Sequence, residues 1–396
     1  MIYRIEAWVS LAGDRVLAGE MVCEVESDGP GRGAFRYASS YLSKPGAFAL
    51  DPISLPLRDG EFEVGPPGIF GVFEDSLPDD WGRKLLVRKN NIRRHHQNLP
   101  NLLLALGASG LGALSYGEKD VPADSSSDVS TMYLENLVKA AEAFERGDVS
   151  DIEIKLLLGA GSSPGGARPK ALVYDEENDT HYLAKFPSIK DDVDVVRIEL
   201  ATMNLAERAG LIVPELRLVK CGSKPVLLVR RFDIIPQGRR HMVSMLTLLK
   251  MSGYYQSRYP DVLSVVRKVS DNPQVDSDRL YRQMVFNAVM HNTDDHLKNF
   301  WMVCDSIEGW RLSKAFDLVP DIGQRGEHVL FFDLDAVYPG KANLIKLGQT
   351  WGVSGAAQIV DQVFSAVAGW RQEFKACGVT SEDIELFNEI DGYLKR

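Results

Sequence analysis

The chain has 396 residues, of which 45% are hydrophobic and 25% charged, as in soluble globular proteins, so disorder of the whole chain is excluded. This length predicts two or three domains with a large buried core. Fifty-five Asp and Glu residues against 45 Lys and Arg residues give a net charge of −10. This charge excludes a surface that coats nucleic acid throughout, but not a local basic patch.

Hydrophobic periodicity predicts a chain that begins with strands and becomes mostly helical after residue 239. In chain order, the predicted elements are strands at 2–9 and 20–25, a helix within 76–88, a polar linker at 117–130, a helix at 132–144, a hairpin of 170–174 and 181–186, a helix at 191–209, a strand at 225–232, a helix at 276–291, a hairpin of 300–304 and 310–315, and helices from about 343. No internal repeat is visible.

Cysteine spacing and the N-terminal segment predict the compartment. The four cysteines lie far apart without a CxxC pair, so neither a zinc ribbon nor a disulfide scaffold is indicated. The first ten residues resemble a strand and lack the apolar segment of a signal peptide. No apolar stretch approaches the roughly 18 residues that cross a bilayer. We therefore expect a soluble, cytoplasmic protein without a membrane partner.

The sharpest polar cluster, residues 290–299, lies where a predicted helix ends and a strand begins. Asp294 and Asn299 have the spacing of a protein-kinase catalytic loop, in which the Asp accepts the substrate hydroxyl proton and the Asn holds magnesium. Asp317 is the candidate second ligand. If residue 304 pairs with residue 310, Asn299 faces Ala315 and Asp317 lies roughly 7–8 Å from Asn299. Two oxygen ligands at that separation can share one magnesium ion.

The same cluster leaves two other interpretations open. His291, Asp294, Asp295 and His296 could ligate zinc or a pair of metal ions in a hydrolase, although the histidines are spaced less regularly than in HExxH. A solvated helix end is the purely structural alternative.

Two charged residues occur at positions that are unfavourable for charge. Lys185 lies within an apolar strand, and Glu199 lies fourteen residues later on the apolar side of a helix. Each charge is costly to bury alone, and an ion pair between them satisfies both. Kinases use such a lysine for the ATP phosphates and such a glutamate to orient the lysine. Two independent side chains that reach solvent are the alternative.

A glycine-rich segment, residues 161–170, stands directly before the hairpin that carries Lys185. Glycines let backbone amides approach phosphates closely, and Lys170 could add a positive charge there. The segment matches neither GxGxxG nor GxxxxGK[ST], so a plain flexible loop is the alternative. Residues 228–233 come last before the helical half, where a kinase hinge would present backbone groups to adenine.

Seven segments follow one another in a specific order along the chain. They are FGVFEDSLPDDWGRKLL, SSPGGARPKALV, LAKFPS, ERAGLIVPELRL, VRRFD, HNTDDHLKNF and AFDLVP. In combination they resemble the HipA-like serine/threonine kinases of bacterial toxin–antitoxin modules, over about residues 3–370. The resemblance implies an α+β, bilobal protein-kinase-like fold with an extra N-terminal β-rich domain and a helical C-terminal lobe.

The resemblance also implies roles for individual residues. Asp294 matches the catalytic base, and Asn299 and Asp317 match the magnesium ligands. The residues that would bind ATP are Ser162, Ser163, Gly165, Gly166, Ala167, Lys170, Lys185, Arg230, Phe232, Asp233 and His296. Ser163 falls where the family carries an autophosphorylated serine, whose modification expels the loop and switches the kinase off.

The family's partner is a helix-turn-helix antitoxin, HipB-like, that binds operator DNA, and its best-known substrates are aminoacyl-tRNA synthetases. This chain's own basic cluster, within residues 89–96, could approach DNA, although such a run is more often a solvated helix face.

We therefore predict an ATP- and magnesium-dependent protein serine/threonine kinase that autophosphorylates at Ser163. The predicted parts are an N-terminal domain at 1–120, a small lobe at 121–235 and a large lobe at 236–396. Two alternatives stay open: a catalytically silent corepressor that acts with the antitoxin, and a metal-dependent phosphohydrolase.

Overall fold

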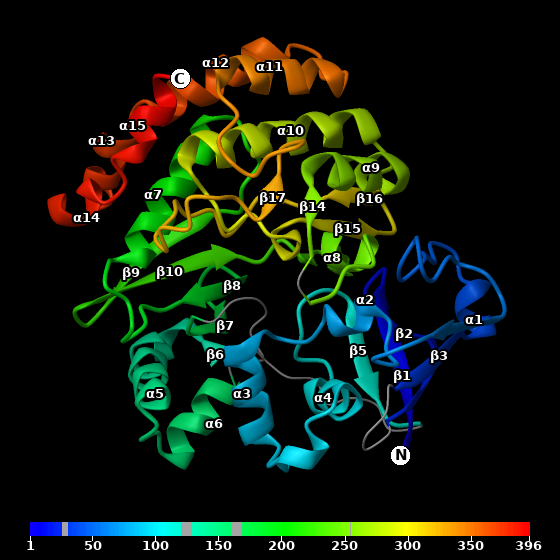
Figure 1. Cartoon of the computed structure of the whole chain (residues 1–396). Helices are drawn as coiled ribbons and strands as arrows, with labels where there is room; N and C mark the ends of the chain where they lie inside the picture. The colour runs from blue at the N-terminus through cyan, green and yellow to red at the C-terminus, as the bar shows by residue number, and fades with distance from the viewer. Residues whose placement is uncertain (26–30, 120–128, 160–167, 254) are drawn as a thin grey trace.

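A computed structural model describes residues 1–25, 31–119, 129–159, 168–253 and 255–396. These residues form two five-stranded sheets and a helical part that lies above both in Figure 1. Among the described residues, no helix combines the length and the apolar character needed to cross a membrane.

The first sheet is antiparallel and has the strand order β4-β3-β2-β1-β5. Its strands are β1 (Ile2–Leu11), β2 (Asp14–Glu24), β3 (Arg32–Tyr37), β4 (Glu61–Val64) and β5 (Leu114–Gly117). A two-residue turn joins β1 to β2, and both Ala12 and Gly13 have positive φ angles of 52° and 91°, as tight hairpins require. The helices in this part of the chain are α1 (Ser39–Leu42), α2 (Gly71–Glu74), α3 (Asp80–Lys89), η1 (Arg94–His96) and α4 (Leu99–Leu106). Of these, α3 packs its Trp81 and Leu85 side chains into the core of the second sheet.

The second sheet has the order β6-β7-β8-β10-β9. Its strands are β6 (Val129–Ser130), β7 (Lys170–Asp175), β8 (Thr180–Lys185), β9 (Leu216–Cys221) and β10 (Lys224–Arg230). The accompanying helices are η2 (Thr131–Tyr133), α5 (Leu134–Arg146), α6 (Asp151–Gly159) and α7 (Val195–Arg208).

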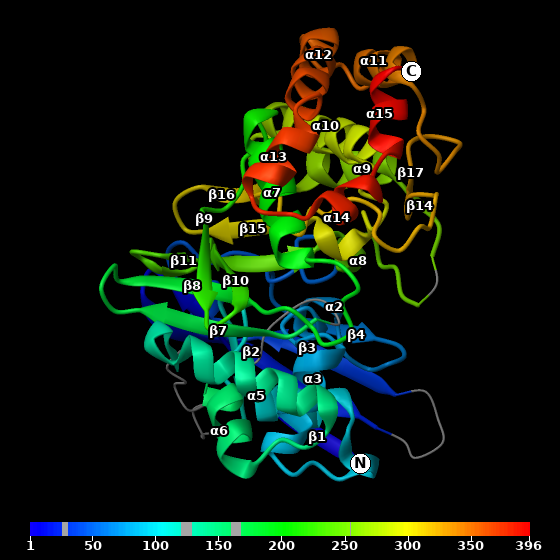
Figure 2. The same ribbon diagram turned by 90° about the vertical axis from the view of Figure 1, so that its left-hand side faces the viewer.

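Alternation along these strands divides the side chains between two faces of the second sheet. Val226 and Leu228 pack with residues of α5, whereas Leu227 and Val229 pack with Val196 of α7. Figure 2 shows α5 and α6 beneath this sheet and the helical part above it. Lys170 and Lys185 are register partners in β7 and β8, so their side chains leave the same face of the sheet.

The helical part contains a three-stranded sheet, β13-β15-β16, and two pairs of short strands. The strands are β11 (Ile234–Ile235), β12 (Gly238–Arg239), β13 (His241–Ser244), β14 (Ser257–Arg258), β15 (Trp301–Asp305), β16 (Gly309–Leu312) and β17 (Leu330–Phe331). The helices are α8 (Met245–Leu248), α9 (Tyr259–Val269), α10 (Pro273–Met290), η3 (Leu297–Asn299), α11 (Lys341–Thr350), α12 (Ala356–Val367), α13 (Trp370–Ala376), α14 (Ser381–Glu385) and α15 (Glu389–Leu394).

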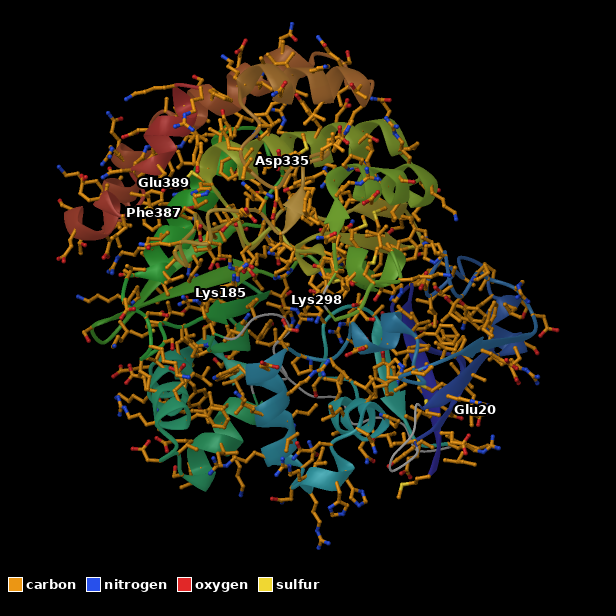
Figure 3. All side chains as sticks on the ribbon, viewed as in Figure 1. Glu20, Lys185, Lys298, Asp335, Phe387 and Glu389 are labelled. Carbon is orange, nitrogen blue, oxygen red and sulfur yellow. The ribbon has the colours of Figure 1, made fainter. Side chains whose placement is uncertain are left out.

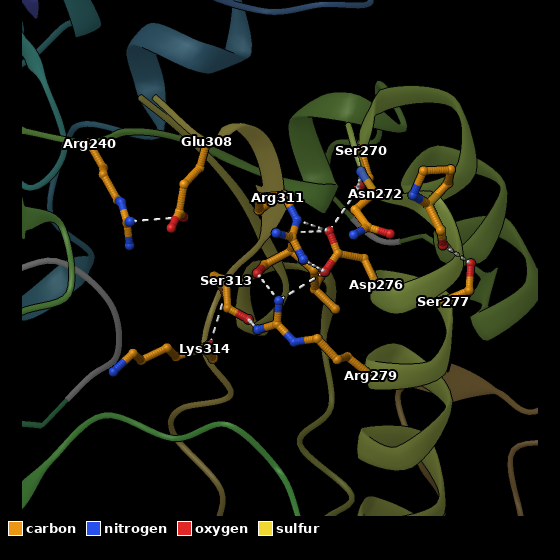
Figure 4. Close-up of polar contacts among 12 residues, drawn as sticks. Arg240, Ser270, Asn272, Asp276, Ser277, Arg279, Glu308, Arg311, Ser313 and Lys314 are labelled. Atoms are coloured by element: carbon orange, nitrogen blue, oxygen red, sulfur yellow. Dashed lines mark hydrogen bonds and ion pairs between the residues drawn. The ribbon is translucent and has the colours of Figure 1, made fainter. Parts of the chain in front are cut away.

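Helix α10 is the central helix of this part, and one buried carboxylate fixes it to the sheet. Asp276 is fully buried and accepts hydrogen bonds from Ser270 Oγ at 2.6 Å, Arg279 Nη1 at 2.9 Å and Arg311 Nε at 3.0 Å (Figure 4). The backbone N–H of Leu312 in β16 donates to it as well, at 2.9 Å. Burial raises the pKa of Asp276, but the bonds from Arg311 and Ser270 outweigh burial and lower it.

The α+β class predicted from the sequence is confirmed, and most predicted elements are present. The predicted helix at 276–291 begins earlier, at Pro273, and ends at Met290, because His291 takes a left-handed conformation with φ 55°. Strand β13 is buried throughout and was missed, since residues 241–244 fall where helices were expected. The pairing of residue 304 with residue 310 is correct. Its extension to Asn299 and Ala315 is wrong, because the register ends at the pair of Met302 and Leu312, Asn299 lies in η3, and the Ala315 N–H donates to Ile212 O.

Candidate active site

A cavity opens where both sheets meet the helical part. Its inner pocket, of about 160 Å³, and its outer pocket, of about 280 Å³, adjoin each other. Both are lined by Lys170, Lys185, Glu199, Asp294 and Asp317. Figure 3 places Lys185 and Lys298 near the centre of the molecule, between the second sheet and the helical part. Asn299, His296 and Phe232 line the inner pocket, so the described residues predicted for ATP and magnesium surround one space.

Lys185 is the centre of a three-residue ionic cluster. Its Nζ atom lies 2.5 Å from Glu199 Oε1 in α7 and 2.7 Å from Asp317 Oδ1. Burial opposes the charge of the Lys185 ammonium, but Asp317 and Glu199 outweigh burial and raise its pKa. Burial also raises the pKa of Asp317, yet attraction to Lys185 leaves it below its usual range. One ammonium thus links the second sheet, α7 and the segment after β16.

Lys170 is the second lysine in the cavity, and its ammonium forms no ion pair with any carboxylate in the described part of the chain. The residue is 94% buried, since its exposed fraction is 6%. Burial lowers the pKa of Lys170 to about 8, although Asp317 favours its charged form. A buried ammonium without its own counter-ion is costly. A ligand with phosphate groups would supply that counter-ion.

The segment that carries Asp294 is held by two side chains that donate to its backbone carbonyls. Asn299 Nδ2 donates to the carbonyl of Asp294 at 2.8 Å, and Trp301 Nε1 donates to Lys298 O at 2.6 Å. The Asp294 carboxylate is 57% exposed and faces the outer pocket, where Arg325 Nη1 lies 2.7 Å from its Oδ1 atom. The loop therefore presents an accessible carboxylate beside the Asn299 amide.

Asp295 points away from the cavity and serves the fold. It is fully buried and accepts bonds from Tyr259 Oη at 2.6 Å and from the backbone N–H of Val329 at 2.9 Å. His328 Nδ1 lies 2.9 Å from Oδ2 of Asp295, the oxygen that also accepts from Tyr259. Within the described residues, no group of three His, Cys, Asp or Glu side chains is arranged to hold a metal ion. This arrangement does not favour the hydrolase interpretation, in which Asp294 and Asp295 act together.

The segment proposed as a hinge contributes both to the cavity and to the fold. The rings of Phe232 and Phe316 lie 5.9 Å apart, and Phe316 also lines the inner pocket. Asp233 is 2% exposed and accepts from Arg231 Nη2 at 2.8 Å, and from the backbone N–H of Gly112 at 2.9 Å. Arg230 is exposed and pairs with Glu215 at 2.9 Å.

Five predicted nucleotide-binding residues, Ser162, Ser163, Gly165, Gly166 and Ala167, lie outside the described residues.

The sequence did not indicate that the N-terminal part of the chain, which forms the first sheet, also lines the cavity. Asp75, Leu77, Asp79 and Leu111 line the inner pocket. Asp79 Oδ1 accepts from Lys298 Nζ at 3.0 Å, across 219 residues of sequence. The acidic run in FEDSLPDD, residues 73–80, was the available signal.

Comparison with known proteins identifies the family. The model of the HipA-like C-terminal domain matches residues 162–370, and the model of the HipA N-terminal domain matches residues 14–117. The chain belongs to the HipA family. Two proteins of Sinorhizobium fredii are similar: one named "Putative kinase Y4dM" is 24% identical over 77% of this chain and 76% of its own length. The other, "Putative kinase Y4mE", is 27% identical over 42% of this chain and 44% of its own length.

A solved structure shares the fold over almost the whole molecule. HipA of Shewanella oneidensis, solved in a complex with HipB and operator DNA, is 18% identical and has a TM-score of 0.70. The match covers 98% of this chain and 95% of that one. The bilobal kinase-like fold with an additional N-terminal β-rich part is therefore shown for this chain.

Proposed function

We propose that this HipA-family chain is an ATP- and magnesium-dependent protein serine/threonine kinase and the toxin of a bacterial toxin–antitoxin module. The observation that carries the proposal is a single cavity that gathers Lys170, the Lys185–Glu199 pair, Asp294, Asn299 and Asp317. The proposal includes the division of the chain into an N-terminal domain, a small lobe and a large lobe, with boundaries at residues 120 and 235.

The residues of the cavity fit a nucleotide with magnesium. Lys185 and Lys170 would bind the phosphates, and the apolar side chains of Leu183, Met203 and Phe232 would contact the base. Arg230 and Asp233 would lie beside that base, and His296 toward the phosphates, since all three line the same pocket. Asn299 and Asp317 offer the oxygen ligands that magnesium prefers, and the bound ion would neutralise phosphate charge.

Each charged residue then has a role in the transfer. Asp294 accepts the proton of the acceptor hydroxyl, for which its exposed carboxylate is accessible from the outer pocket. Glu199 orients Lys185, because their ion pair fixes the ammonium on the cavity side of the sheet. Fixed positive charge placed where negative charge develops lowers the barrier to transfer.

Partners are proposed from the family and the solved relative. We infer a helix-turn-helix antitoxin of the HipB type, and operator DNA that is contacted mainly through that antitoxin, since the Shewanella protein was captured with both. An aminoacyl-tRNA synthetase is the proposed protein substrate, and the cytoplasm the proposed location.

Incubation of the purified chain with magnesium and ATP, followed by mass spectrometry, tests the activity. We expect one added phosphate at Ser163 and its loss in Asp294→Asn, which keeps the shape of the side chain but removes its capacity to accept a proton. Asp295→Asn is the matched comparison, and we expect it to lower the melting temperature because Asp295 is buried and fully hydrogen-bonded.

Other outcomes would support the alternatives. A chain that represses its promoter with the antitoxin, binds ATP and never transfers phosphate would be a catalytically silent corepressor. Phosphatase activity with bound zinc or manganese, and no ATP binding, would contradict the kinase proposal in favour of a phosphohydrolase.

A further inference from the structure

Arg325 forms an ion pair with Asp294, the proposed catalytic base. Arg325 Nη1 lies 2.7 Å from Asp294 Oδ1, and both side chains line the outer pocket. A general base must come within roughly 2.6–3.2 Å of the hydroxyl whose proton it accepts. An acceptor hydroxyl that approaches Oδ1 therefore competes with Arg325 for this oxygen.

The ion pair is built to be exchanged. The Arg325 and Asp294 side chains are 52% and 57% exposed, and ion pairs so open to water are weak. Arg325 lies between Gln324 and Gly326, whose φ angles are 51° and 73°. The backbone N–H of Gly326 donates to the side-chain Oδ2 of Asp321 at 2.9 Å, and a Cβ atom built on Gly326 would meet no other atom within 4 Å. The Arg325 side chain is thus half exposed, and the turn is open to solvent at Gly326.

From this geometry we propose that Arg325 is a specificity-determining residue, which binds a carboxylate of the acceptor polypeptide near the acceptor hydroxyl. The inference rests on the proposed kinase activity and names the substrate class of that same site. The Arg325 guanidinium exchanges its ion pair with Asp294 for one with the substrate carboxylate. The Asp294 carboxylate can then accept from the acceptor hydroxyl. Arg168 stands at the same pocket and pairs with Asp191, so its charge is already engaged.

Distances indicate where the acidic residue lies in the acceptor sequence. The guanidinium that leaves Asp294 starts about 3 Å from this carboxylate, and a hydroxyl bound to Asp294 also lies about 3 Å from it, so the two groups start within roughly 6 Å of each other. In an extended chain, side chains two residues apart share a face and lie roughly 7 Å apart, whereas neighbouring side chains point to opposite faces. An acid two residues before or after the acceptor therefore fits, and an adjacent acid does not.

Peptides with one serine and a single Glu, Lys or Ala at each nearby position test the proposal. Binding is measured by fluorescence anisotropy with a non-hydrolysable ATP analogue, and transfer with ATP and magnesium. We expect the wild-type chain to prefer Glu two residues from the serine over Ala at least about fivefold, by both measures. Arg325→Ala should lose the preference, and Arg325→Glu should favour Lys at that position.

The matched control is Arg4→Glu. Arg4 forms a similarly exposed pair with Glu20 in the first sheet, far from the cavity in sequence, and its reversal should leave the peptide preference unchanged. Equal binding of Glu and Ala peptides by the wild type would overturn the proposal. So would an unchanged preference in Arg325→Glu, or a loss confined to ATP binding, which would mean that Arg325 serves the nucleotide phosphates.

The two proposals fail in different ways. If no peptide and no residue of the chain receives phosphate, the kinase proposal fails. The binding measurement still decides the role of Arg325, because it requires no transfer.

Discussion

Lys170 is the residue whose charge state should control nucleotide binding. Burial lowers its pKa to about 8, so its ammonium loses a proton as the pH rises through that value. Phosphates favour the charged form, and we expect ATP affinity to fall by up to about tenfold per pH unit above 8. Titration calorimetry between pH 7.5 and 9.5 measures this change.

Lys170→Arg is the control for this dependence. A guanidinium stays protonated throughout the range, so the affinity of the variant should be nearly constant between pH 7.5 and 9.5. Lys185 contributes no slope there, because Asp317 and Glu199 raise its pKa. A wild-type slope that persists in Lys170→Arg would assign the titration to another group.

At the residue scale, sequence could identify some pairs and not others. Lys185 and Glu199 were paired on paper because each is costly in an apolar setting, and they lie 2.5 Å apart. The contacts of Asp317 with Lys185 and of Arg325 with Asp294 were not anticipated. Exposed or irregular segments carry no periodicity, so nothing in the sequence indicates which charge they approach.

At the scale of single elements, the position of α10 depends on Asp276. Asp276→Ala leaves the guanidinium groups of Arg279 in α10 and Arg311 in β16 without their shared carboxylate. Breaking a buried ion pair by removing one partner costs about 3 kcal/mol or more. We expect the melting temperature, measured by circular dichroism, to fall by several degrees.

Asp278→Ala separates this effect from a general loss of charge on the same helix. Asp278 is only partly buried and accepts one bond, from Gln274 Nε2 at 3.0 Å. Its removal should change the free energy of unfolding by less than about 0.5 kcal/mol. Equal melting temperatures for the two variants would show that the Asp276 network does not hold α10.

Element length decided which elements could be predicted. Helices α7 and α10 span enough turns to show helical periodicity, so they were found with shifted ends. Strand β13 has four residues, all buried, and a short buried run has no period that separates strand from helix. The long-range bond between Ala315 and Ile212 likewise has no local signature.

At the scale of the whole molecule, the first sheet's part of the chain is fixed to the helical part through Asp75. Its two carboxylate oxygens accept from the backbone N–H and the Oγ of Ser244, both at 2.8 Å. Burial raises the pKa of Asp75 to about 6, and the bonds from Ser244 only partly oppose this. The negative charge of Asp75 at neutral pH therefore destabilises this contact between the two parts. Asp75 also lines the inner pocket.

Asp75→Asn should stabilise the chain at neutral pH. A carboxyl whose pKa is raised in the folded state contributes stability below its unfolded pKa of about 3.8, and loses it as the pH rises through about 6. An amide stays neutral and can accept from the N–H and donate to the Oγ of Ser244, so the variant avoids this loss. We expect its melting temperature to exceed the wild-type value by a few degrees at pH 7.5, equivalent to about 3 kcal/mol, and by almost nothing near pH 3. A difference that is constant over this range would show that the Asp75 charge does not strain the contact between the two parts.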